Sequence, residues 1–143
     1  MADWRGDYIA EMTLEMAEKA IAAARSKAKE IGAPMAVSVV DGAGRLVMFV
    51  RGEGTGFFTP ESTKGKAVAA AALRRPTAEL GNFGGNPTTL AIYASIVPGG
   101  FWPASGGCPV VRNGQLIGAV GCGGGSGEQD HECAQAGVDA LTD

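Results

Sequence analysis

A chain of 143 residues has room for one hydrophobic core, and we expect a single domain over residues 1–143. Hydrophobic residues make up 45% of the chain and charged residues 19%, and no apolar run reaches the ~20 residues needed to cross a bilayer, so we expect no membrane insertion. The net charge is −3 and the basic residues are scattered, which argues against nucleic acid as a partner.

The N-terminus and the cysteines both indicate the cellular compartment in which the protein is expected. Residues 1–7 mix charges and lack the apolar centre of an export signal. Cys108, Cys122 and Cys133 are odd in number and form no Cys-x-x-Cys pair, which is typical of free thiols in a reducing environment. The sequence therefore predicts a cytoplasmic protein.

The first predicted element is a helix that begins after Thr13. Apolar residues recur at steps of three and four from residue 14 to residue 31, and Gly32 follows. Two β-rich runs come next, at 35–40 and 46–50, and turn-forming residues join them. This pair predicts an antiparallel hairpin.

A second helix is predicted to begin at Thr59, acting as the capping residue, with Pro60 and Glu61 in the first turn. It is expected to run to about Leu73, before Pro76. Its alanine-rich interior permits close approach to a sheet, to another helix or to a second subunit.

The stretch from 77 to 100 is broken by glycine and proline, and only residues 88–94 predict a further short element. Residues 101–102 are interpreted as a short strand. Asn113-Gly114 lies between two β-rich runs and is a strong hairpin signal. A glycine loop at 123–127 then leads into a terminal helix. Hairpins alternating with helices indicate an α+β fold with an antiparallel sheet flanked by helices.

Several stretches, in their order along the chain, resemble the GlcG/HbpS-like family of haem-degrading or haem-binding domains, which also form the C-terminal part of PduO-type corrinoid adenosyltransferases. The resemblance implies a profilin-like fold, homo-oligomeric assembly and haem as a possible cofactor. Residues 51–55 and His131 differ from what relatives commonly carry. The matching stretches are 38–47, 66–67, 106–110, 118–121 and 124–130.

The glycine loop before the terminal helix is the first candidate site. Backbone N–H groups at Gly124 and Gly125, followed by a helix N-terminus, favour an anion or a carbonyl oxygen, and Ser126 and Gln129 are candidate ligand contacts. Alternatively, the glycines only let a strand and a helix meet at a sharp angle.

Three residues at the start of the terminal helix are candidates for catalysis. Glu128 could orient the imidazole of His131, and Asp130 lies between them. His131, the only histidine, is also a candidate axial ligand for haem iron, with a Met or a residue of a partner subunit as the alternative. The other interpretation is that both acids stabilise the helix N-terminus and that His131 is exposed.

Lys66 is the remaining candidate ligand contact. The resemblance selects it over Lys64, and its ammonium could pair with a ligand carboxylate or extend to water. Four aromatic residues in irregular segments could form walls for a planar ligand, or pack in the core or at a subunit contact: Phe57, Phe58, Phe101 and Trp102.

The sequence therefore predicts a small-molecule binding protein, with haem or a related tetrapyrrole as the first choice because of the resemblance. Two other functions stay open: a cofactor-independent enzyme acting on a small carbonyl or carboxylate metabolite, and an oligomeric accessory protein without chemistry.

Overall fold

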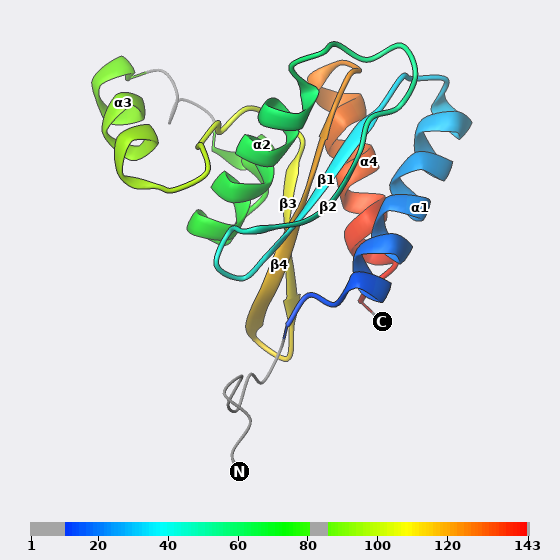
Figure 1. Ribbon diagram of the computed structural model, residues 1–143, viewed down its shortest axis with the longest axis horizontal. Coiled ribbons are helices and arrows are strands. Elements are labelled where there is room, and N and C mark those ends of the chain that lie inside the picture. The colour runs from blue at the N-terminus through cyan, green and yellow to red at the C-terminus, as the bar shows by residue number, and fades with distance from the viewer. Residues whose placement is uncertain (1–10, 81–85, 143) are drawn as a thin grey trace.

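An antiparallel sheet forms the centre of the protein in the computed structural model, which describes residues 11–80 and 86–142 (Figure 1). Within these residues the sheet has four strands in the order β2-β1-β4-β3. β1 and β4 are the central pair, in register from Ala36 opposite Gly123 to Asp41 opposite Gly118. The α+β fold predicted from the sequence is confirmed. The strands are β1 (Ala36–Asp41), β2 (Leu46–Val50), β3 (Gly107–Arg112) and β4 (Gln115–Gly123).

Both predicted hairpins are present, and each turn has a local cause. Between β1 and β2, Asp41 Oδ1 accepts hydrogen bonds from the backbone N–H groups of Ala43 (2.9 Å) and Arg45 (3.0 Å). Between β3 and β4, Asn113 and Gly114 have φ values of 52° and 75°. Two positive φ values are what a two-residue type I′ turn requires.

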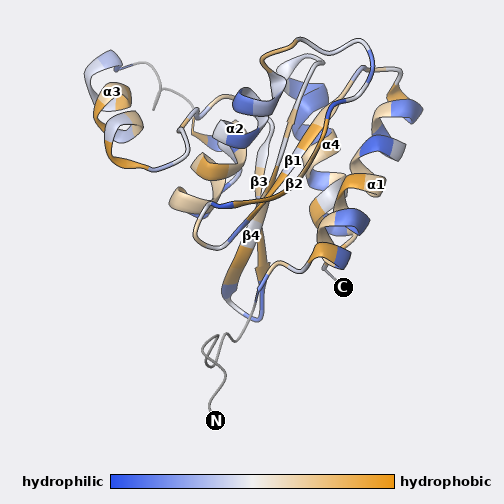
Figure 2. Cartoon of the chain, in the orientation of Figure 1, coloured by the Kyte–Doolittle hydropathy of each residue, from blue (hydrophilic) through white to orange (hydrophobic). Residues whose placement is uncertain are grey.

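Helices cover the two faces of the sheet separately. α1 (Leu14–Ile31) and α4 (Gly127–Asp139) lie on one face, and α2 (Thr59–Leu73) lies on the other (Figure 1). The larger core cluster joins α1 and α4 to strand residues such as Val37 and Val120, and a smaller one joins the alanines of α2 to Val40 and Ala119. The hydrophilic residues of α1 lie mainly on its side away from the sheet (Figure 2).

α2 rests directly on the sheet because glycines face it. A Cβ atom at Gly121 would overlap the backbone carbonyl of Thr63, and one at Gly107 would overlap that of Lys66. Four alanines of α2 (Ala67, Ala69, Ala70 and Ala71) are buried within the chain itself, three of them in a cluster with strand residues, and only Ala72 is exposed. They are therefore not free for a second subunit, one of the uses expected from the sequence.

The ends of the helices confirm one predicted cap and correct another. Thr13 Oγ1 accepts a hydrogen bond from Met16 N (3.1 Å), as predicted for the start of α1. Thr59 is not the cap of α2, because it is the first residue of the helix and its hydroxyl donates backward to Gly56 O (2.9 Å). Phe58 occupies the cap position and makes no side-chain cap hydrogen bond.

Between α2 and β3 the chain forms η1 (Thr77–Glu79) and α3 (Pro87–Ile96), so the element expected at 88–94 is a helix. Part of the break expected in this region, residues 81–85, lies outside the described residues. The strand expected at 101–102 is wrong. Trp102 N donates its hydrogen bond to Gly65 O of α2 (3.1 Å) instead of to a neighbouring strand.

Candidate functional site

The loop from β4 to α4 is closed by its own side chains. Ser126 Oγ accepts from Gln129 N (3.2 Å), and Gln129 Oε1 accepts from Ser126 N (2.9 Å), which is a capping box. Asp130 Oδ1 accepts from Gly125 N (2.9 Å). Of the backbone N–H groups that the sequence offers for an anion, that of Gly125 is therefore already bonded within the chain, and so is that of the next residue, Ser126.

Lys66 and Asp130 form a buried ion pair. Lys66 Nζ lies 2.9 Å from Asp130 Oδ2, and the side chain of each is 6% exposed. The same ammonium donates to Cys122 O, also at 2.9 Å. Burying two charges is costly unless they are paired and hydrogen-bonded, and both conditions hold here. The pair thus joins the middle of α2 to the end of β4 and the start of α4.

This pair lies in the wall of a cavity of about 300 Å³, which we call the Lys66 cavity. It is built by the β2–α2 loop, the first turns of α2, the segment before β3 and the β4–α4 loop, which meet at one end of the molecule (Figure 1). Its lining residues are Gly54, Thr55, Gly56, Phe58, Thr59, Ser62, Lys66, Trp102, Gly123, Gly124, Gly125 and Asp130.

Aromatic rings lie beside the charged pair. Lys66 Nζ is 5.2 Å from the centre of the Trp102 ring, within the range of a cation–π contact. Trp102 is 44% exposed and Phe58 is 55% exposed, so both rings offer apolar surface to a ligand. Of the other two aromatics considered from the sequence, Phe101 is buried and Phe57 is exposed, and neither lines the cavity.

The other sequence candidates lie elsewhere. Glu128 is exposed at the first turn of α4. His131 lines a separate open groove beside Lys27 and Glu132, and its Nδ1 is 3.6 Å from Cys108 Sγ. The structure therefore brings Lys66, Gly124, Gly125 and Asp130 together at one cavity and places His131 at another surface.

The three cysteines are free and buried. Burial raises the pKa of the Cys108 thiol from 9.0 to about 12 and that of Cys133 to about 11, and it also raises the pKa of Cys122 well above 9.0. Thiolates are the reactive form, so these are structural side chains. Among the described residues, no group of three or more His, Cys, Asp or Glu side chains is placed to hold a metal ion.

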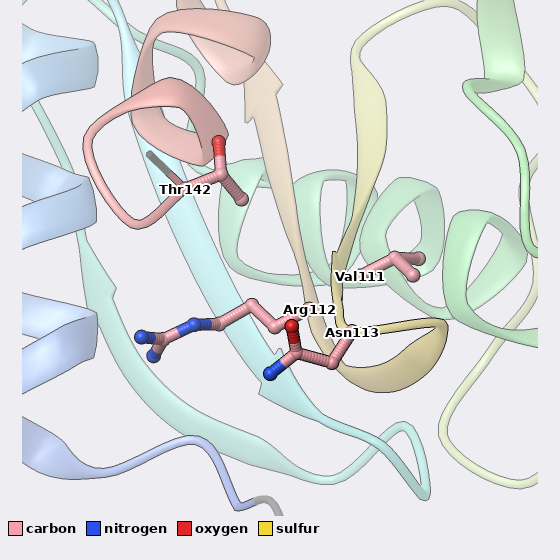
Figure 3. Close-up of a pocket in the computed structure, with 4 residues that line it drawn as sticks. All are labelled: Val111, Arg112, Asn113 and Thr142. Atoms are coloured by element: carbon pink, nitrogen blue, oxygen red, sulfur yellow. The ribbon is translucent and has the colours of Figure 1, made fainter.

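A further hollow of about 240 Å³ lies at the tip of the β3–β4 hairpin (Figure 3). Arg112 and Asn113 line it together with Val111 and Thr142. These side chains bring no charged pair and no buried polar group together, so the Lys66 cavity is the better candidate site.

Comparison with known proteins identifies the family of the chain. Residues 12–139 match the family described as haem degrading protein HbpS-like. The chain belongs to this family. A relative from Citrobacter freundii, an uncharacterised 15.0 kDa protein encoded between dhaT and dhaS, is 32% identical over 139 residues, covering 97% of this chain and 98% of the relative.

Two solved structures of the family share the fold. HbpS superposes with a TM-score of 0.82 at 33% identity, covering 98% of this chain and 99% of that one. A complex of PduOC with haem superposes with a TM-score of 0.78 at 29% identity, covering 91% and 94%. In the described part of this chain, no helix is long and apolar enough to span a membrane.

The sequence alone did not predict the ion pair at the centre of the site. It treated Lys66 as a free cation and Asp130 as a helix-start acid, whereas the two form one pair across 64 positions. It also missed the cavity residues Thr55 and Ser62. One available signal was a lysine within an alanine-rich helix, since a buried lysine needs an acidic partner.

Proposed function

We propose that this protein binds haem or a related tetrapyrrole at the Lys66 cavity. The observation that carries the proposal is the combination, in one hollow, of a buried ion pair with the exposed rings of Phe58 and Trp102. A tetrapyrrole has both a flat apolar face and polar edge groups. The family description and the haem complex of PduOC support the same class of ligand.

The size of the cavity limits how much of the ligand enters. About 300 Å³ is at the lower end of the range for small-molecule sites, roughly 300–1,000 Å³. We therefore expect one edge of the tetrapyrrole to enter and the rest to lie against the exposed aromatic rings. Lys66 has three N–H donors and uses two of them, for Cys122 O and Asp130 Oδ2. One donor is left for an oxygen atom of the ligand.

The residues of the cavity do not fit an iron ligand. Haem iron is held by His, Cys, Met or Tyr, and none of these side chains lines the Lys66 cavity. His131 lines the other groove. The cavity therefore fits the organic part of the ligand, and we expect metal-free protoporphyrin IX to bind as tightly as haem.

Titration with haem and with protoporphyrin IX tests this function. Binding is followed by the Soret band of haem and by quenching of tryptophan fluorescence. Phe58→Ala should weaken both ligands about fivefold or more because it removes part of the apolar wall. Phe57→Ala is the matched control, because Phe57 is the neighbouring exposed ring outside the cavity. Absence of binding to every tetrapyrrole tested would reject the proposal.

The His131→Ala variant distinguishes binding in the Lys66 cavity without an iron ligand from ligation of the haem iron by His131. We expect unchanged affinity for haem, with folding retained, because the imidazole lies outside the cavity. A loss of haem affinity with no loss for protoporphyrin IX would instead assign His131 to the iron.

We also propose a homo-oligomer, as the family resemblance implies. α3 has ten residues and buries none of them, and Ile92 and Ile96 are 54% and 67% exposed. Helices of this length are marginal in water unless packing supports them. A neighbouring subunit lying on α3 would supply that packing.

A further inference from the structure

The Lys66–Asp130 pair presents a donor and an acceptor side by side to the cavity. The ammonium keeps one N–H after its bonds to Cys122 O and Asp130 Oδ2. The carboxylate accepts from Lys66 at Oδ2 and from Gly125 N at Oδ1, which leaves lone pairs on both oxygens. Because the nitrogen and Oδ2 are 2.9 Å apart, a ligand group that meets one of them is close to the other.

The charges of the pair decide what kind of group fits. Lys66 and Asp130 carry opposite charges, and the described cavity lining contains no other charged side chain. A ligand carboxylate would be attracted by the ammonium but repelled by the carboxylate beside it. A neutral group with an acceptor next to a donor can satisfy both partners and leaves no buried charge unpaired.

We propose that the pair recognises a lactam edge, a C=O with an adjacent ring N–H, as found on the terminal rings of an open-chain tetrapyrrole. The lactam oxygen accepts from Lys66 Nζ, and the lactam N–H donates to the carboxylate of Asp130. This inference rests on the proposed tetrapyrrole function and names open-chain tetrapyrroles as the preferred ligands. It involves binding only, with no covalent or redox step.

The surroundings of the pair suit a single five-membered ring. The cavity of about 300 Å³ is too small for a whole macrocycle but large enough for one terminal ring with its substituents. Gly123, Gly124 and Gly125 form one wall, and the absence of side chains there lets a ring approach the backbone. Trp102 lies 5.2 Å from the ammonium and can face the ring of the ligand.

A comparison of two ligands tests the proposal. Biliverdin carries lactam edges as well as propionates, whereas protoporphyrin IX carries propionates and no lactam. The wild-type protein should bind biliverdin about tenfold or more tightly than protoporphyrin IX, since a hydrogen bond to a charged partner distinguishes them. Tryptophan fluorescence quenching measures both affinities.

Asp130→Asn tests the role of the acceptor. The variant should lose most of the preference for biliverdin, because it removes both the carboxylate that faces the lactam N–H and the negative charge that repels a propionate of protoporphyrin IX. Lys64→Met is the matched control, since Lys64 is also on α2 but does not line the cavity. It should keep the preference unchanged.

An infrared measurement on the wild-type protein decides the question even if Asp130→Asn fails to fold. The lactam C=O stretch of bound biliverdin should move to lower frequency than that of the free pigment, as a hydrogen bond from Lys66 requires. Equal affinities for the two ligands and an unmoved stretch would overturn the lactam proposal but leave tetrapyrrole binding intact. Failure of haem, protoporphyrin IX and biliverdin alike to bind would overturn both.

Discussion

At the scale of single residues, the most constrained feature is the Lys66–Asp130 pair. Each side chain is 6% exposed, so each charge depends on the other for its compensation. Asp130 also accepts from Gly125 N and so fixes the glycine loop. The same contacts that stabilise the fold therefore shape the wall of the cavity.

Lys66→Met should destabilise the protein by about 3–5 kcal/mol, because it leaves the Asp130 carboxylate buried without its partner. The double variant Lys66→Met/Asp130→Asn should recover part of that loss. Urea unfolding measures the free energies, and Lys64→Met serves as the surface control, with a change below ~1 kcal/mol. A Lys66→Met variant as stable as the wild type would contradict the burial of the pair.

The thiols predict a loss of stability in alkali. Burial raises the pKa of Cys108 from 9.0 to about 12, so between these values the unfolded chain releases a proton that the folded chain retains. This contribution to stability is complete below pH 9 and is lost as the pH rises toward 12. Urea unfolding between pH 8 and ~10.5 should show the decline, and Cys108→Ala should make it shallower. An identical slope in the variant would count against this assignment.

At the scale of elements, turns and helix caps that depend on local sequence were predicted mostly correctly, whereas contacts between distant parts of the chain were not predicted. The Asn113-Gly114 turn, the Asp41 turn and the Thr13 cap depend on neighbours within four residues, and all three were predictable. The prediction of Thr59 as the N-cap was wrong because the helix begins at Thr59 itself, one residue earlier than that role requires. The pairing of Lys66 with Asp130 depends on α2 and α4 meeting at the end of β4, which no local pattern encodes.

Gly121→Ala tests the close approach of α2 to β4. The added Cβ would overlap the Thr63 carbonyl, so α2 must shift away from the sheet, and we expect a loss of about 1–3 kcal/mol in thermal or urea unfolding. Gly127→Ala is the control, because its Cβ would meet only the Ser105 side chain, at 3.3 Å. Equal effects of the two substitutions would argue against tight packing at Gly121.

At the scale of the whole molecule, α3 is the element least explained by a single chain. It buries none of its residues, whereas α1, α2 and α4 all contribute buried residues to the core. α3 contacts the rest of the chain through Tyr93, whose ring stacks on Phe101 with 5.4 Å between the ring centres. We propose that a neighbouring subunit covers its exposed isoleucines.

Light scattering at micromolar concentration should therefore give a mass that is a multiple of 14.5 kDa. The double variant Ile92→Glu/Ile96→Glu should lower that mass, because it places charges on the exposed face of α3. Thr88→Glu is a control at the start of the same helix. A wild-type protein that is strictly monomeric would exclude the proposed oligomer.

A co-crystal structure with biliverdin will show whether a tetrapyrrole enters the Lys66 cavity. We expect electron density for one terminal ring within hydrogen-bonding distance of Lys66 Nζ and Asp130, with the pigment lying against Phe58 and Trp102. Pigment bound instead in the groove at His131, with the Lys66 cavity empty, would rule out the Lys66 cavity as the binding site.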